Sequence, residues 1–201
     1  MAAQWEDEEA LLGSIGLRAV GDDLAPLRAA ATRVARHIAS HQLGVVGFVP
    51  TDALVATPAV LIHLGLALVE LTGATVAVVD ANVRYPALAA LSTGASRHND
   101  ESVFSTRWLR GSLALLSPTK VERAGDVLPQ LARLLGEGAD LFKHVLVDLT
   151  GFELLGEHAA AAASMEAVVL VGRAHRSRER ELLALAQSMP PERFLGVMLV
   201  G

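Results

Sequence analysis

Apolar runs of strand length alternate with apolar-periodic segments of helix length along most of this chain. The strand-like runs occupy residues 44–49, 75–79, 113–116, 144–148, 167–171 and 194–200. Helical spacing of the apolar residues is found in segments 22–41, 59–71, 127–135 and 178–188. Nearly continuous Val and Leu runs are typical of strands that are buried on both faces. The pattern therefore predicts an α/β fold, a three-layer α/β/α sandwich around a mostly parallel sheet.

Residues 53–69 contain no charged side chain and could be mistaken for a membrane span. The window includes Pro58 and His63 and falls short of the about 20 residues that cross a bilayer. It also stands between two strand-like runs, where a parallel sheet needs a crossover helix. We expect a buried helix here and no direct insertion into a membrane.

Composition and charge narrow the class of protein. The chain has 201 residues, of which 52% are hydrophobic, and no cysteine, which excludes disulfides and thiolate metal sites. Its net charge of −5 argues against a nucleic-acid partner. The acidic start, Glu6 to Glu9, is unlike a signal peptide. We expect a cytoplasmic protein with an N-terminal extension, residues 1–21, and a single domain, residues 22–201.

The loop after the first strand-like run stands where many α/β proteins bind phosphate. Such a loop supplies glycine backbone, a lysine and a Ser or Thr for magnesium. Residues 50–58 read Pro-Thr-Asp-Ala-Leu-Val-Ala-Thr-Pro and contain neither glycine nor lysine. Asp52 would bring a negative charge to the place where an anion would sit, so the sequence gives the frame of a phosphate site without its chemistry.

Four further segments have the order of parts of a known family. Residues 76–86 form an apolar run that continues as Asp-Ala-Asn-Val-Arg-Tyr-Pro, and later runs end at Asp148, Arg173 and Gly201. Together they resemble the deviant Walker A ATPases, P-loop NTPases that include the ParA and MinD proteins. The segment 76–86 is most similar to the second Walker motif of bacterial tyrosine autokinases, the cytoplasmic domains of polysaccharide co-polymerases. The resemblance covers roughly residues 24–201 and implies a P-loop NTPase-like fold.

The resemblance also shows which nucleotide ligands are missing. By motif position, Thr57 replaces the phosphate-binding lysine, Pro58 replaces the magnesium-binding Ser or Thr, and Asp52 replaces the signature lysine. Asn82 stands for the second acid of the autokinase motif, and Val200 for the Asn that contacts the base. We therefore predict a vestigial nucleotide site, with no cofactor and no metal, whose members are Asp52, Ala56, Thr57, Pro58, Asp80, Asn82, Arg84, Asp148 and Val200.

Asp80 and Asp148 allow two interpretations. In a working enzyme the resemblance would make them magnesium-linked carboxylates, with Asp80 assisting the attacking group. In a structural role they would be acceptors for the turns that follow two strands. The missing lysine favours the structural interpretation, so we assign no catalytic residue.

Candidate contacts for a partner lie elsewhere. Trp108 stands beside two arginines and could anchor an interface or close the edge of the core. Arg173, Arg176, Arg178 and Arg180 form a basic segment that suits an acidic partner. His37 and His41 share a helix face, but a metal site needs a third ligand.

The leading hypothesis is a catalytically inactive pseudo-ATPase that acts as a protein-interaction or regulatory module. By resemblance, its context would be bacterial polysaccharide synthesis or export, or subcellular positioning. Its partner would be an active paralogue or a membrane-bound assembly protein, and a homodimer is a further option. The alternatives are an active ATPase or kinase with a rebuilt pocket, in which Arg84 or Arg173 replaces the lysine, and a DNA-associated ParA-like partitioning protein.

Overall fold

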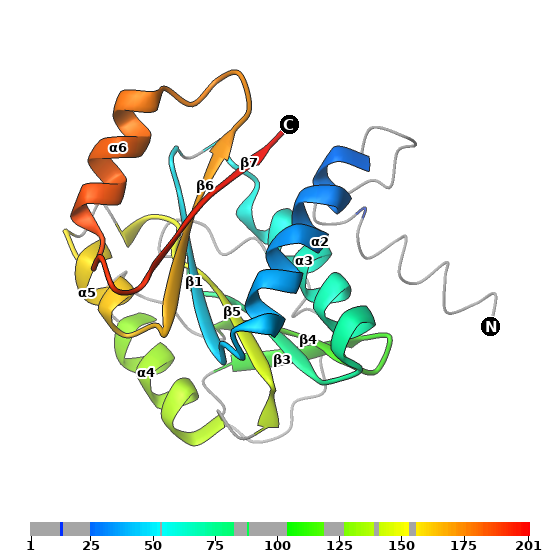
Figure 1. The fold of residues 1–201 in the computed structure, drawn as a ribbon. Coiled ribbons are helices and arrows are strands. Elements are labelled where there is room, and N and C mark those ends of the chain that lie inside the picture. Colours follow the sequence, from blue (N-terminus) through cyan, green and yellow to red (C-terminus); the bar gives the residue numbers. More distant parts are fainter. Residues whose placement is uncertain are drawn as a thin grey trace.

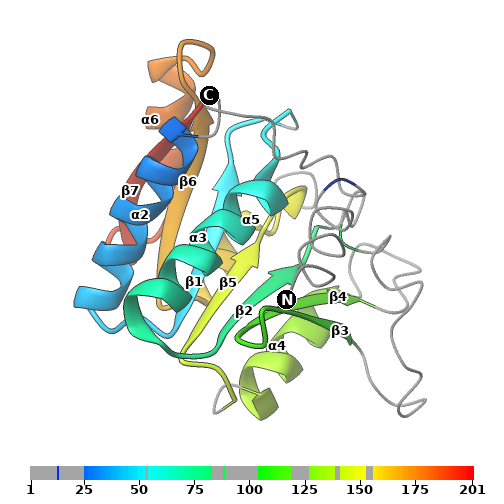
Figure 2. The same ribbon diagram turned by 90° about the vertical axis from the view of Figure 1, so that its right-hand side faces the viewer.

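The structure is a computed structural model, and it describes residues 13, 25–52, 54–82, 88, 104–118, 127–138, 141–152 and 156–201. The side chains of 128, 137 and 138 are outside this description. Among the described residues, seven strands form one sheet in the order β3-β4-β2-β5-β1-β6-β7. Helices cover both faces of the sheet, as the sequence pattern predicts (Figures 1 and 2).

All neighbouring strands are parallel except the pair at one edge, β3 and β4. The strands are β1 (Val45–Pro50), β2 (Val76–Asp80), β3 (Phe104–Leu109), β4 (Leu113–Pro118), β5 (His144–Asp148), β6 (Ala167–Arg173) and β7 (Phe194–Val200). The central strands β2, β4 and β5 are buried at every residue. Their near-continuous apolar sequences follow from this burial on both faces.

The helices divide between two hydrophobic layers. They are α2 (Ala25–Ser40), α3 (Thr57–Thr72), α4 (Val127–Gly138), α5 (His158–Ala163) and α6 (Glu179–Ser188). Helices α2 and α3 share one core cluster with one face of the sheet. Residues from α4, α5 and α6 join the cluster on the other face.

Helix α3 accounts for the uncharged segment 53–69. One side of it packs against β2 and the other against α2, so apolar residues occupy nearly its whole circumference. Gly65 lets the helix approach the sheet, because a Cβ there would lie 2.7 Å from Leu113 Cδ1. Gly73 ends the helix in the left-handed conformation, with φ of 66°. None of the described helices combines the length and hydropathy needed to cross a bilayer.

Two elements have no counterpart in the sequence prediction. Strand β3 is an edge strand with three consecutive exposed residues, Thr106 to Trp108, so its sequence lacks the apolar run of the central strands. Helix α5 is a single short alanine-rich segment, which shows no amphipathic period. The elements that the sequence predicts are all present; the bounds of β5 and β7 match the prediction, and no other boundary differs by more than three residues.

Candidate functional site at the carboxyl edge of the sheet

The candidate site lies where β1, β2 and β5 end. In an open parallel sheet, ligands bind in the crevice at the carboxyl ends of the strands. The crevice forms where the connections that follow two neighbouring strands run to opposite faces of the sheet. Here β1 lies between β5 and β6, and the loop after β1 leads into α3. Asp148 pairs in register with Phe48 of β1 on one side and with Asp80 of β2 on the other. The sheet therefore brings both acids to the loop after β1.

The backbone N–H groups of residues 54, 55 and 57 donate hydrogen bonds within this loop. Asp52 Oδ1 accepts from the Leu54 amide at 2.8 Å, and the Asp52 carbonyl accepts from the Val55 amide at 3.2 Å. The Thr57 amide donates to the Val55 carbonyl at 2.9 Å. Pro58 has no N–H to offer at the start of α3. Phosphate-binding loops direct backbone N–H groups at the anion, whereas the N–H groups of residues 54, 55 and 57 are directed at acceptors within the loop.

Thr57, which by motif position replaces the phosphate-binding lysine, lies inside the protein. Its side chain is fully buried, and its Oγ1 lies 3.3 Å from Thr150 Oγ1. The Thr150 hydroxyl donates to Asp148 Oδ1 at 2.5 Å. Ala56 precedes α3 without a side-chain cap, and Pro58 lies in the first turn. At the start of α3, Thr57 and Thr150 are thus buried and in contact with each other.

A second set of contacts joins the loop to the segment after β6. Arg173 Nε and Nη2 both lie 3.3 Å from Asp52 Oδ2, and the two side chains are about one-third exposed. Thr51 donates its amide to the Val171 carbonyl at 2.9 Å and hydrogen-bonds through its hydroxyl to Ser177 at 2.9 Å. Arg173, a candidate replacement for the lysine, therefore neutralises an acid of its own chain.

The two strand-end acids hold their own turns. Asp80 is buried, and its two oxygens accept from the amides of Asn82 at 3.1 Å and Leu88 at 2.7 Å. Asp148 is also buried, and its Oδ1 accepts from the Thr150 amide at 2.9 Å as well as from the Thr150 hydroxyl. In each case the acid binds the amide two residues downstream, a common turn motif. In this geometry both carboxylates are acceptors for the turns that follow their strands.

The comparisons with solved structures assign the fold. Superposed on the BceF tyrosine kinase domain, the chain gives a TM-score of 0.66 at 18% identity, over 87% of this chain and 76% of that one. The VpsO kinase domain gives a TM-score of 0.72 at 17% identity, over 86% of this chain and 93% of that one. The kinase domain of the Escherichia coli tyrosine kinase ETK gives a TM-score of 0.68 at 16% identity, over 84% of this chain and 72% of that one.

The fold is that of bacterial tyrosine kinase domains. The fold class expected from the sequence, including its P-loop NTPase-like character, is thereby confirmed. No family model and no curated protein matches the chain.

Within this kinase-domain fold, the remaining candidate residues are dispersed. Val200 is half-buried in β7, and its carbonyl accepts from the Ala174 amide at 2.8 Å. Arg84 lies outside the described residues, as does most of the extension 1–21. In the part of the chain that the structure describes, no group of three or more His, Asp or Glu side chains could hold a metal ion.

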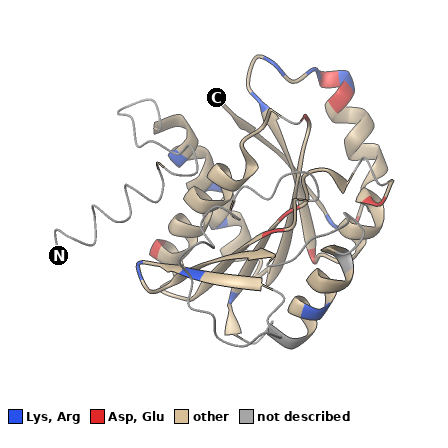
Figure 3. Ribbon diagram, turned by 180° about the vertical axis from the view of Figure 1, so that it is seen from behind, with Lys and Arg blue, Asp and Glu red and all other residues tan. Residues whose placement is uncertain are grey.

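The candidate partner contacts lie on two separate surfaces. Trp108 is 49% exposed on the edge strand β3, and its ring centroid is 5.9 Å from that of Phe142. Arg176, Arg178 and Arg180 are exposed in the segment that leads into α6 and in its first turn. Figure 3 shows the blue of Lys and Arg along this segment of the ribbon. Arg178 lies 3.9 Å from Glu181. Their role in binding a partner stays a prediction.

Sequence reasoning missed Thr150 and Ser177 as members of the site. Thr150 follows Asp148 by two residues, so an Asp-x-Thr turn after a predicted strand could have drawn attention to it. Ser177 is separated from Thr51 by 126 residues, and no local pattern links them.

Proposed function

We propose that this protein is a catalytically inactive ATPase-fold domain that acts by binding other proteins. The observation that carries the proposal is the pairing of Arg173 with Asp52 at 3.3 Å across the loop where nucleotide phosphates would lie. A phosphate placed there would meet the Asp52 carboxylate and would have to separate it from its arginine. Both effects oppose nucleotide binding.

The use of the loop amides supports the same conclusion. Leu54, Val55 and Thr57 donate their N–H groups to acceptors within the loop, so an entering phosphate would have to displace these bonds. Each broken bond leaves a carbonyl or carboxylate in need of another donor, at about 1–3 kcal/mol if it is buried. The replacement of the phosphate-binding lysine by Thr57 and of the magnesium-binding Ser or Thr by Pro58 weakens nucleotide binding further.

The context that we propose rests on the resemblance to tyrosine autokinases of polysaccharide co-polymerases. An inactive copy of such a domain would regulate or assemble a polysaccharide synthesis or export complex in the bacterial cytoplasm. It would bind an active paralogue or a membrane-bound assembly protein. Positioning of a cellular cargo is the second context that the ParA and MinD resemblance offers.

One observation favours an active enzyme as a second candidate function. Asp80 and Asp148 are register partners on adjacent strands, so their carboxylates meet at one edge of the sheet. Carboxylate pairs can hold a hard cation such as Mg²⁺. An active ATPase or kinase would then need a cation for the phosphates, and Arg173 could serve only by leaving Asp52.

Isothermal titration of the full chain with ATP or ADP and magnesium distinguishes the two functions. We expect no heat above that of mixing. The ETK kinase domain, titrated in parallel, is the positive control and should show heat of binding. A micromolar dissociation constant would overturn the proposal and support the enzyme. Hydrogen exchange supplies a second readout, because the amides of residues 54, 55 and 57 should be protected equally with and without Mg-ATP.

The protein-binding part of the proposal has its own test. A domain without a nucleotide switch has one conformation and binds its partner at an affinity that ATP does not change. Pull-down from the native host should recover the same partner with and without added ATP. Recovery that depends on ATP would contradict the proposal.

A further inference from the structure

Strand β7 forms one edge of the sheet, and among the described residues it pairs with β6 alone. Strand β7 is the last strand of the sheet, and β6 is its neighbour on one side. The Val200 carbonyl accepts from the Ala174 amide, so the polar backbone groups of residue 200 face β6. Because these groups alternate in direction along a strand, those of Val197 and Leu199 face outward, away from β6.

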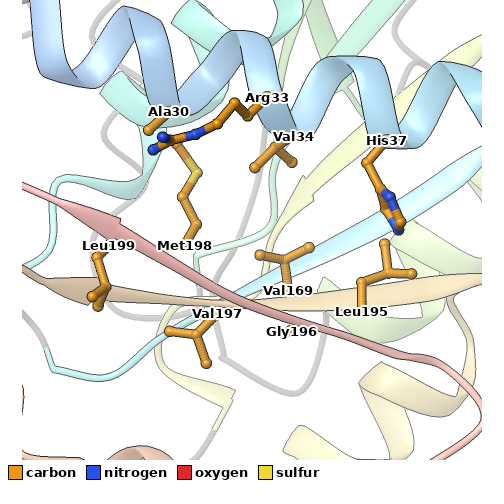
Figure 4. Close-up of a pocket in the computed structure, with 10 residues that line it drawn as sticks. All are labelled: Ala30, Arg33, Val34, His37, Val169, Leu195, Gly196, Val197, Met198 and Leu199. Carbon is orange, nitrogen blue, oxygen red and sulfur yellow. The ribbon is translucent and has the colours of Figure 1, made fainter.

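A cleft lies between this edge and α2 (Figure 4). It has a volume of about 420 Å³ and is bounded by residues of α2 on one side and of β7 on the other. Arg33 and His37 provide its polar side chains, and Met198 extends from β7 toward α2. The cleft therefore lies between the outer edge of β7 and two hydrogen-bonding side chains of α2.

The charge of this region has one sign. Helix α2 carries Arg28, Arg33, Arg36 and His37 and no acidic residue, although the chain as a whole has a net charge of −5. The cleft lining likewise contains no Asp or Glu. Arg33 has a permanent positive charge, and the His37 imidazole offers a ring N–H. A negatively charged ligand is complementary to this wall.

The other face of the edge is apolar. Val197 and Leu199 are 44% and 50% exposed, and their side chains point away from α2 (Figure 4). Met198, between them, is buried on the α2 side. A strand added beside β7 would have alternate side chains on these two faces.

We propose that this edge binds an extended segment of a partner protein in which acidic and apolar residues alternate, added as an eighth strand beside residues 197–200. Side chains two apart on a strand are separated by about 6.7 Å. Residues four apart on a helix are separated by about 6 Å along its axis. Carboxylates at alternate positions of the segment would thus meet Arg33 and His37, while the residues between them cover Val197 and Leu199.

The irregular start of β7 limits the length of this pairing. The register between β6 and β7 shifts at Val168/Val169, and Gly196 has φ of 134°. Such bulges discourage uncontrolled pairing at sheet edges. Regular pairing is therefore available only beyond Gly196, which suits a short segment and disfavours a long continuous edge.

The test is a titration of the full chain with a fluorescein-labelled peptide, Val-Glu-Val-Glu-Val-Glu-Val, without nucleotide. We expect saturable binding that weakens with salt and is absent for the same peptide with Lys in place of Glu. Arg33→Glu should weaken binding tenfold or more. The matched control is Arg36→Glu, which makes the same charge change on an exposed α2 residue outside the cleft. Equal weakening by both variants, or equal binding of the Lys peptide, would overturn the proposal.

A second variant tests strand pairing. Leu199→Pro removes an outward N–H and leaves the bonds to β6, so the variant should fold and lose most peptide affinity. Unchanged affinity would overturn the strand-addition geometry.

Two other occupants would also overturn the proposal. If a second copy of the chain covered the edge, sedimentation would show a dimer, and Leu199→Pro would dissociate it. Binding only after Glu6, Asp7, Glu8 and Glu9 are changed to Gln or Asn would identify the chain's own acidic segment. The proposal shares with the pseudo-ATPase function only the expectation of a protein partner, and its failure would leave the nucleotide titration unaffected.

Discussion

Asp80 and Asp148 occupy the same register position at the ends of neighbouring parallel strands, and each accepts a hydrogen bond from the amide two residues downstream. The same geometry that would bring two acids to a magnesium ion also lets each acid hold its own turn. Because both side chains are buried, the turns depend on these carboxylates.

Asp80→Ala should destabilise the protein without abolishing partner binding. The substitution removes the acceptor for the amides of Asn82 and Leu88, and two buried donors without a carboxylate cost roughly 2–6 kcal/mol. Asp80→Asn retains one acceptor oxygen and should lose about half as much. Urea unfolding measures both variants. A variant with wild-type stability and no partner binding would instead assign Asp80 a functional role.

The Asp52–Arg173 pair should make a small, salt-sensitive contribution to stability. The pair is about one-third exposed, so solvent screens it and we expect a coupling of about 0.5–1 kcal/mol. A double-mutant cycle with Asp52→Asn and Arg173→Gln measures this coupling at two salt concentrations. The exposed pair Arg178 and Glu181, 3.9 Å apart, serves as a control with coupling near zero. Equal couplings for the two pairs would contradict the prediction.

His63 should make the protein less stable in mild acid. Burial in α3, and secondarily the positive charge of Arg28, lower the pKa of His63 below its ordinary value of 6.5. As the pH falls through 6.5, the unfolded chain takes up a proton that the folded protein resists, so the free energy of unfolding decreases. The decrease from one group is at most about 1.4 kcal/mol per pH unit. At pH values above the pKa of His63 in the unfolded chain, this group does not change the free energy of unfolding.

Urea unfolding between pH 7.5 and 5 measures the effect as the difference between wild type and His63→Gln. The variant should lose less stability on acidification. Arg28→Gln, which removes the secondary cause, should give an intermediate slope. A wild-type slope in His63→Gln would show that other groups produce the acid sensitivity.

Gly65 and Gly136 should respond in opposite directions to alanine. At Gly65 a new Cβ would lie 2.7 Å from Leu113 Cδ1, between α3 and the sheet, so crowding should cost about 1–3 kcal/mol. Gly136 is exposed within α4 and has nothing within 4 Å of a new Cβ. Alanine there should stabilise the helix by about 0.5–1 kcal/mol. Thermal unfolding compares the two, and destabilisation of equal size at both sites would refute the packing argument.

The sequence by itself determined most of the layered fold. Strands β1, β2, β5 and β6 are encoded by local runs of Val and Leu, because each is buried on both faces of the sheet. The uncharged sequence of α3 has the same cause, since α2 and the sheet enclose it. The edge strand β3 was not predicted, because its exposed residues do not have to be apolar and its sequence therefore has no apolar run.

Within the candidate site, local sequence identified the loop after β1 and the acids at the ends of β2 and β5, but not their partners. The tertiary structure decided that Arg173 neutralises Asp52 across 121 residues, and that the Thr57 and Thr150 hydroxyls meet across 93. The position of β7 at an edge of the sheet, beside α2, was likewise not predictable from the sequence. Periodicity reports which side chains are buried, whereas pairing between distant loops depends on how the strands order themselves in the sheet.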